Sequence, residues 1–129
     1  MSNNETVESC FVPLSKIPII GKGDNLKKAL DLMTEKRLGI ALIVDSEQKL
    51  LGVLTDGDLR RLLLTRQNPL PALLVTAAIE FGNKKPKSIK FDVSVEEAKA
   101  VMGNEEIWDL PIIDDAGRLI GLVHRHSLT

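Results

Sequence analysis

The sequence predicts an α+β fold, an α/β sandwich in which two pseudo-symmetric β-α-β-β-α units pack as one module. The first observation is an internal repeat: the chain aligns with itself at a constant offset that places Ile20 on Ile89 and Leu59 on Leu128, with no gap between. The second is that each copy carries an apolar stripe at helical spacing followed by two short apolar runs, which is typical of a helix and a strand pair. The identical pairs are Ile20/Ile89, Ala29/Ala98, Met33/Met102, Ile43/Ile112, Asp45/Asp114, Leu50/Leu119, Gly52/Gly121 and Leu59/Leu128.

The first copy opens with a short lead-in strand at residues 18–20 and a helix capped by Asp24 or Asn25. A continuous apolar run at residues 40–44 predicts a buried strand, and residues 50–54 complete a hairpin. Thr55 then begins a second helix. The stripe of the first helix is Leu26, Ala29, Leu30 and Met33, and that of the second is Leu59, Leu62 and Leu63.

The second copy repeats this order. Residues 87–91 form the lead-in strand, and Ser94 with Glu97 has the spacing of a capping box. Residues 110–113 and 119–123 are the paired strands, and Gly103 with Asn104 suits the end of the helix. The helical stripe is Val95, Ala98, Val101 and Met102.

The expected organisation is a first repeat with its lead-in at residues 1–66, a linker at 67–86 and a second repeat at 87–129 whose last helix is truncated. The apolar stretch 72–79 predicts a short helix inside the linker. Each copy is too short to bury a core well alone, so the two copies pack together, and the cleft between them is the predicted ligand site.

The composition excludes several classes of function. A net charge of −1 gives no field that favours nucleic acid or a membrane surface, and aromatic residues are scarce. No apolar run approaches the roughly 18 residues needed to span a bilayer. The polar residues 1–9 predict no secretory leader, and the lone Cys10 indicates a reducing, cytoplasmic location.

The duplicated unit resembles the CBS domain pair, or Bateman module. The resemblance rests on residues 38–40 (LGI), on the IVD and IID triplets at 43–45 and 112–114, and on the run GVLTDGDL at 52–59. It implies a regulatory module that binds an adenosine-type nucleotide, has no catalytic residues and forms a homodimer, here through the stripe Leu59, Leu62 and Leu63.

A closer likeness is to the CBS pairs of KpsF/GutQ-type arabinose-5-phosphate isomerases. It rests on TDGDLRR at residues 55–61, on KRLGI at 36–40 and on GLVHRH at 121–126. It implies a linked sugar-phosphate isomerase domain of Kdo biosynthesis and a CMP-sugar as a candidate effector. Two alternatives remain open: the regulatory head of a sugar-nucleotidyltransferase, and a dimerisation module without ligand.

Thr55 and Asp58 are the first candidate ligand residues. In nucleotide-binding CBS repeats, a threonine and an aspartate at this spacing contact phosphate and ribose. An ionised carboxylate accepts hydrogen bonds from both ribose hydroxyls, and a helix N-terminus favours phosphate. The alternative is a simple capping box. The equivalents in the second copy are His124 and Ser127, so we expect unequal sites.

The other candidates are less specific. His124 and His126 contact an acidic ligand or are solvated polar residues; with no further histidine or a suitable cysteine, we expect no metal site. Trp108 packs on a base or sugar, or anchors the core or a dimer. The resemblance extends the expected ligand contacts to Ile20, Gly39, Ile40, Ala41 and Arg125.

Overall fold

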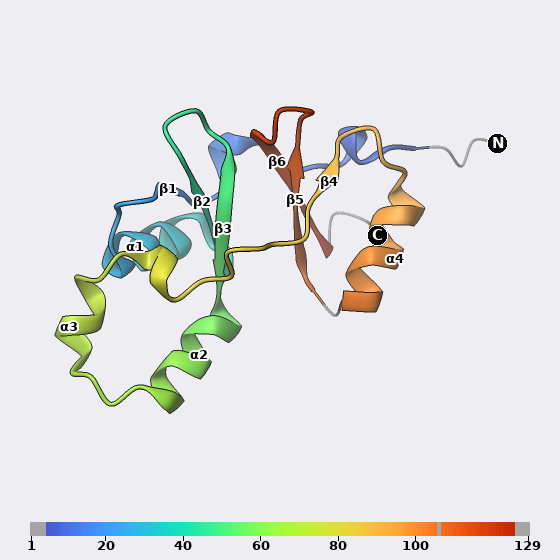
Figure 1. The fold of residues 1–129 in the computed structure, drawn as a ribbon. Helices are drawn as coiled ribbons and strands as arrows, with labels where there is room; N and C mark the ends of the chain where they lie inside the picture. The colour runs from blue at the N-terminus through green and yellow to red at the C-terminus, as the bar shows by residue number, and fades with distance from the viewer. Residues whose placement is uncertain (1–4, 106, 126–129) are drawn as a thin grey trace. The chain divides into compact units, whose positions relative to one another are not determined.

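The structure, a computed structural model, describes residues 5–105 and 107–125. The chain divides into two compact units (Figure 1). The first-repeat unit is continuous, Ile17–Pro86. The second-repeat unit combines Met1–Lys16 with Lys87–Thr129. The N-terminal segment therefore belongs to the second repeat and not to the first repeat, which directly follows it in the sequence.

The first-repeat unit contains a three-stranded sheet in the order β1-β2-β3. The hairpin partners β2 (Ile40–Val44) and β3 (Leu50–Thr55) are antiparallel, and β1 (Ile19–Gly21) runs parallel to β2. Helix α1 (Leu26–Lys36) crosses from β1 to β2, and Asn25 caps it by accepting from the backbone N–H of Lys28 at 2.9 Å.

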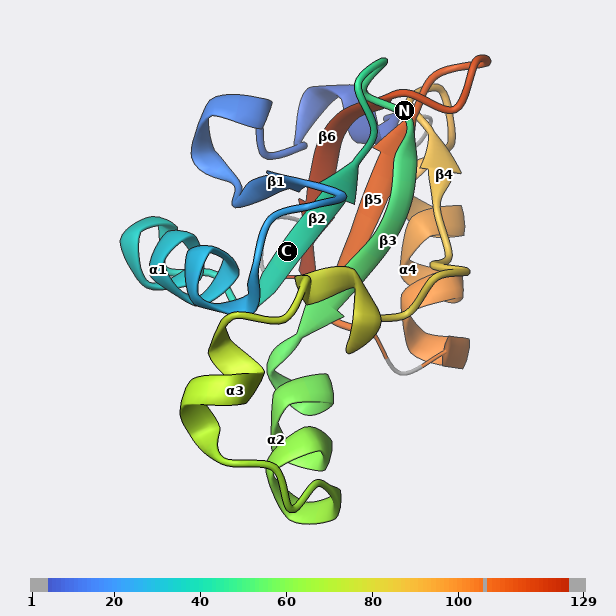
Figure 2. The same ribbon diagram turned by 60° about the vertical axis from the view of Figure 1, so that its left-hand side comes forward.

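Two further helices complete this unit. Figure 2 shows α2 (Asp56–Thr65) continuing from the end of β3, and α3 (Leu70–Leu74) returning toward α1. A 3-10 turn, η3 (Ala78–Glu80), follows. The stretch expected as one short helix at 72–79 is therefore two elements, because the chain leaves the helix after Leu74 to pair with the start of α1.

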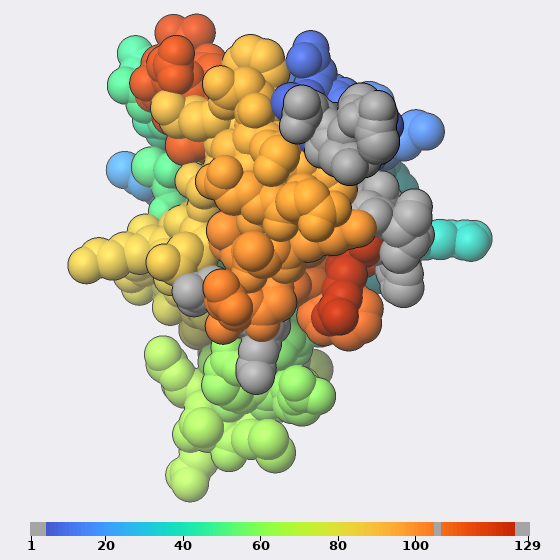
Figure 3. Space-filling model, turned by 90° about the vertical axis from the view of Figure 1, so that its right-hand side faces the viewer, coloured from blue at the N-terminus to red at the C-terminus, as the bar shows by residue number. Residues whose placement is uncertain are grey.

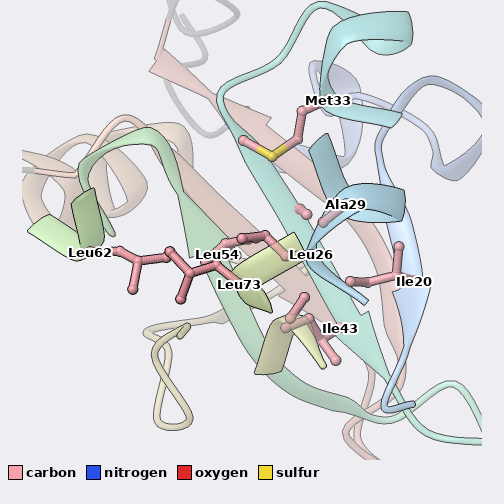
Figure 4. Packing of buried hydrophobic residues seen from close by; sticks show 10 residues of the cluster. Ile20, Leu26, Ala29, Met33, Ile43, Leu54, Leu62 and Leu73 are labelled. Atoms are coloured by element: carbon pink, nitrogen blue, oxygen red, sulfur yellow. The ribbon is translucent and has the colours of Figure 1, made fainter. Parts of the chain in front are cut away.

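The core of this unit lies between one face of the sheet and these helices (Figure 4). All five residues of β2 are buried, which confirms the prediction from its continuous apolar run.

The leucine stripe of α2 was expected to face a partner, but Leu62 is only 6% exposed and belongs to this core. Leu59 packs against the same core, so of the three only Leu63 is exposed, at 63%. The expectation is wrong for Leu62, because its side chain packs into the hydrophobic core of its own unit.

The second-repeat unit has the same plan. Its sheet has the order β4-β5-β6, with β4 (Ile89–Lys90) parallel to β5 (Asp109–Ile113) and β5 antiparallel to β6 (Leu119–His124). Helix α4 (Val95–Glu105) continues beyond the end expected at Gly103, and Figure 3 shows its outer side in orange. Ser94 caps it by accepting from Glu97 N–H at 3.1 Å. The α+β class and the repeated strand-helix-hairpin order are confirmed.

The N-terminal segment completes this unit. It carries two 3-10 turns, η1 (Val7–Ser9) and η2 (Leu14–Lys16). Val7 is fully buried among the core residues of the second repeat. Val12 and Leu122 exchange backbone hydrogen bonds of 2.6 and 3.1 Å, which cover the free edge of β6.

Residues 76–83 do the same for the first repeat. Asn83 and Val53 exchange backbone bonds of 2.7 and 3.0 Å along β3, and Ala78 is buried as Val7 is. We call residues 5–12 and 76–83 the leader segments. They are equivalent residue by residue, and each pairs with the repeat that it does not directly precede. The equivalent backbone bonds are Val95–Glu5 and Leu26–Thr76 (both 2.9 Å), and Val7–Val93 (3.0 Å) and Ala78–Asp24 (2.9 Å).

The repeated glycines Gly52 and Gly121 are explained by the pairing of each leader segment with an edge strand. A Cβ at Gly52 would lie 2.8 Å from the backbone oxygen of Asn83, and one at Gly121 would collide with the ring of Phe11. A side chain at Gly52 would therefore push against the backbone of its leader segment, and one at Gly121 would force the Phe11 ring to move.

The hairpin turns also repeat. Asp45 accepts from the backbone N–H groups of Lys49 and Glu47, and these bonds hold the pKa of its carboxyl below the ordinary value. Asp114 does the same in the second hairpin. Each turn has one left-handed residue, Gln48 (φ 68°) and Gly117 (φ 85°).

No helix among the described residues has the length and apolar character that a membrane span requires.

The left-handed turn gives a test of the fold. Gly117→Ala should lower the free energy of unfolding by about 1 kcal/mol, because a Cβ is disfavoured at positive φ. Gly103→Ala is the matched control: it lies near the end of α4 with open space around it, and should raise stability by about 0.5–1 kcal/mol. Urea unfolding followed by circular dichroism measures both, and shifts in the same direction would contradict the assigned turn.

Candidate functional site

Thr55 and Asp58 lie at the N-terminus of α2 and form a complete capping box. The Thr55 hydroxyl accepts from the backbone N–H of Asp58 at 3.3 Å. In return, Asp58 Oδ2 accepts from the Thr55 backbone N–H at 2.9 Å and from the Thr55 hydroxyl at 3.1 Å. The structure therefore contains the capping box that was one of the two interpretations of this motif.

Asp58 has a further partner one turn along the helix. Arg61 donates from Nη2 to Asp58 Oδ1, and its own side chain is 68% exposed while that of Asp58 is 14% exposed. The carboxylate thus lies mostly below the surface, with an exposed cation on its outer oxygen. A phosphate or hydroxyl that approached the helix N-terminus would meet both groups.

The residues expected beside this pair differ in how accessible they are. Ile40 lies opposite Thr55 in the β2–β3 register, and Gly39 accepts from the backbone N–H of Asp56 at 3.0 Å. Ile20 and Ala41 are buried in the core of the first-repeat unit. Only Gly39 of these four borders the surface, since Ile40 is 1% exposed.

A hollow of about 320 Å³ opens on the same side of the first-repeat unit. It lies between the last turns of α1 and the start of α2, and Gly39 forms part of its wall. A Cβ at Gly39 would collide with Asp56 Oδ2, so the glycine allows this carboxylate to lie against the backbone. The lining residues are Leu30, Met33, Thr34, Arg37, Leu38, Gly39 and Asp56.

The second-repeat unit carries different side chains at the equivalent positions. His124, the counterpart of Thr55, ends β6, and its Nδ1 lies 2.7 Å from Asp109 Oδ1 on the neighbouring strand. Both side chains are mostly buried, at 26% and 10% exposed. The aspartate orients the imidazole ring through this contact to Nδ1.

Trp108 and Arg125 lie next to this pair. The Arg125 backbone N–H donates to Trp108 O at 2.8 Å, and the guanidinium lies over the indole ring at 4.8 Å from its centroid. Trp108 is 54% exposed. His126 and Ser127 lie outside the described residues.

Two features of these sites were missed from the sequence. Asp109 aligns with Ile40 in the internal repeat, and that change from apolar to acidic opposite a histidine was a usable signal. The hollow had no signal, because it depends on the absence of a side chain at Gly39 and on the left-handed Arg37 (φ 58°) that ends α1. Across the described ranges, no three His, Cys, Asp or Glu residues form a group that could hold a metal ion.

A family model for the CBS domain matches residues 7–65 and 78–129. The chain belongs to the CBS domain family. The two matches begin at Val7 and Ala78, which are equivalent residues of the two leader segments. Each CBS domain of the sequence therefore includes the leader that precedes it.

Curated relatives include isomerases. The probable arabinose 5-phosphate isomerase of Haemophilus influenzae is 35% identical over 113 residues, which are 88% of this chain and 32% of that protein. Arabinose 5-phosphate isomerase KdsD of Francisella tularensis is 32% identical over 123 residues, 95% of this chain and 36% of that protein. The chain therefore spans about a third of the length of these relatives.

Solved structures share the fold. The CBSX2 protein of Arabidopsis thaliana, in its crystal structure with AMP, superposes with a TM-score of 0.84 over 96% of this chain and 92% of that one, at 22% identity. The chain is thus a CBS pair of α+β fold.

Proposed function

We propose that this CBS pair is a non-catalytic, cytoplasmic regulatory module that binds a nucleotide at Thr55 and Asp58. The observation that carries the proposal is the Asp58 carboxylate, which lies at a helix N-terminus with its outer oxygen beside an exposed arginine. The AMP bound by CBSX2, a protein of the same fold, supports a nucleotide as the class of ligand.

The capping role of Asp58 is compatible with a ligand. A carboxylate offers about four acceptor positions. Thr55 uses two hydrogen bonds on Oδ2 and Arg61 uses one on Oδ1. An acceptor position for a ribose hydroxyl remains on Oδ1, and Arg61 can turn toward a phosphate because most of its side chain is exposed.

The second repeat favours a ligand with an acidic group. His124 stands where the first repeat has Thr55, and Asp109 orients its ring. An imidazole can hydrogen-bond to a carboxylate or a phosphate, and a nucleotide-linked acid sugar such as CMP-Kdo, which carries both groups, is the ligand proposed for this pair of unequal sites.

The parent enzyme in this proposal is a sugar-phosphate isomerase of Kdo biosynthesis. The two isomerases described above match this chain over 88% and 95% of its length. An isomerase that begins such a pathway could be regulated by the end product of the pathway, and the CBS pair would be the part of the enzyme that binds it. The alternative parent is a sugar-nucleotidyltransferase.

The module also forms a homodimer in this proposal. Large apolar side chains are exposed on and after α2, among them Leu63 (63%), Leu64 (80%) and Val75 (74%). Exposed side chains of this size need cover in solution. The rival function, dimerisation without ligand, draws support from the same residues and from the bonds that already engage Asp58.

Asp58→Ala should weaken nucleotide binding at least about tenfold, because a hydrogen bond to a charged group contributes roughly 1.5–3 kcal/mol. Isothermal titration with AMP, ATP, CMP and a CMP-sugar measures the affinity. Ser94→Ala is the matched control, since it removes the cap of α4 at a cost of about 1 kcal/mol in stability and leaves Asp58 intact.

Equal affinities of the wild type and Asp58→Ala would show that Asp58 is only a cap. If no nucleotide binds at millimolar concentration, the ligand-free dimerisation module becomes the better function.

Feedback is tested in the full-length parent. CMP-Kdo should change its isomerase rate, because an effector shifts activity only when it binds the active and inactive states with different affinity. The change should disappear when His124 and His126 are both replaced by Ala, and persist in the control Lys84→Ala/Lys85→Ala, which removes two exposed charges elsewhere. A constant rate at every ligand concentration, or a parent without an isomerase domain, rejects this part of the proposal.

Sedimentation equilibrium at micromolar protein should give about twice the chain mass of 14.2 kDa. Leu63→Glu should reduce this mass if the exposed leucines of α2 are at the interface, because a buried charge opposes association. A wild type that stays monomeric contradicts the dimer.

A further inference from the structure

The Arg61 side chain lies across the first turn of α2. Its Nη2 donates to Asp58 Oδ1. A Cβ at Gly57 would lie 3.6 Å from Arg61 Nη1 and 3.6 Å from Thr55 Oγ1, which places the other end of the guanidinium beside the Gly57 backbone. Within residues 5–105 and 107–125, the Arg61 side chain has no further hydrogen bond or ion pair. The guanidinium therefore covers the outer oxygen of Asp58 and keeps Nη1 available to another acceptor.

The hydrogen-bonding capacity of the Asp58 carboxylate is nearly used up. A carboxylate has about four acceptor positions. The Thr55 backbone N–H and hydroxyl take two of them on Oδ2, at 2.9 and 3.1 Å, and Arg61 takes a third on Oδ1. A ribose with its 2′ and 3′ hydroxyls donates two hydrogen bonds. The carboxylate therefore lacks one acceptor position for a complete ribose diol as long as Arg61 stays in place.

Arg61 is the donor that a diol displaces most easily. The two bonds from Thr55 belong to the capping box, and the Thr55 hydroxyl also accepts from the Asp58 backbone N–H at 3.3 Å. The Arg61 side chain is 68% exposed, so water can replace its contact with Asp58 at little cost. A diol that takes both positions on Oδ1 therefore releases the arginine and leaves the cap of α2 intact.

We propose that a ribose diol displaces Arg61 from Asp58, and that the released guanidinium binds the phosphate of the same ligand. A guanidinium matches the oxygens of a phosphate as well as those of a carboxylate, so the arginine exchanges one anionic partner for another. Its Nη1 already lies beside Gly57 in the first turn of α2, so the exchange needs only a side-chain rotation.

The exchange makes Arg61 the residue that determines selectivity at this site. A nucleoside breaks the Arg61–Asp58 pair and offers no replacement, whereas a ribonucleotide replaces it with a phosphate. A 2′-deoxynucleoside donates only one hydrogen bond to the carboxylate and leaves the pair in place. The site thus selects ligands that carry a ribose diol and a phosphate together. This inference rests on the nucleotide site of the proposed function and adds the reason for its selectivity.

Arg61→Ala tests the exchange through opposite effects on two ligands. Adenosine should bind the variant about threefold more tightly, the size expected for an ion pair with one exposed partner. AMP should bind at least about tenfold more weakly, because the charged contact to its phosphate is lost. The affinity for 2′-deoxyadenosine should not change. Isothermal titration measures these affinities, together with those of the corresponding cytidine compounds, and circular dichroism confirms that the variant is folded.

Arg60→Ala is the matched control, because Arg60 is an exposed arginine of the same helix and, in the described part of the chain, no hydrogen bond or ion pair joins it to Asp58. It should leave the ratio of the AMP and adenosine affinities unchanged. The wild type provides a second measurement without any substitution. Inorganic phosphate should draw Arg61 from Asp58, so adenosine should bind up to about threefold more tightly in phosphate than in chloride of equal ionic strength. Arg61→Ala should abolish this difference.

Two results would overturn the exchange and leave nucleotide binding at Asp58 in place. If Arg61→Ala weakens AMP but does not strengthen adenosine, the arginine contacts phosphate without competing for the carboxylate. If the variant weakens AMP and adenosine equally, Arg61 only supports the cap. A wild type that binds neither nucleotides nor nucleosides would overturn the exchange and the proposed nucleotide site together.

Discussion

The backbone pairing between a leader segment and an edge strand is the contact on which the rest of the structure depends. Each sheet has three strands, and without its leader β3 or β6 would present unpaired N–H and C=O groups along one edge. Val12 and Asn83 satisfy these groups on Leu122 and Val53. The glycines at 52 and 121 make room for that pairing, Val7 and Ala78 are buried by it, and the first residues of α1 and α4, Leu26 and Val95, donate to carbonyls of the leader segments.

Because the backbone is repeated so closely, the differences in function lie in side chains at equivalent positions. The strand-to-helix junction holds a threonine and an aspartate in one unit and a histidine beside an aspartate in the other. The same junction has a glycine facing Asp56 in one unit and a tryptophan under Arg125 in the other. Duplication thus gives two copies of one scaffold, and substitution at a few positions makes the two strand-to-helix junctions chemically different.

Much of this fold could be predicted from periodicity alone. The run from Ile40 to Val44 is a buried strand because every residue is apolar, and Thr55 begins a helix because its hydroxyl suits a cap. The leader segments could not be predicted in this way, since pairing at a distance leaves no periodic signal in so short a stretch. The Asp109–His124 contact depends on the register between two strands, and the hollow depends on a missing Cβ at Gly39. Local pattern therefore determined the elements, and long-range pairing determined the sites.

The leader arrangement has a consequence for the order in which the chain folds. Asn83 pairs with Val53 inside one continuous stretch of chain, whereas Val12 must wait for Leu122, which lies near the opposite end of the sequence. Closing the longer loop costs about 1 kcal/mol more in chain entropy, and such non-local contacts form later. During synthesis the first-repeat unit is complete once residue 86 has emerged, while the N-terminal segment stays unpaired until the last strand is made. Any domain fused upstream of residue 5 is consequently attached to the part of the module that assembles last.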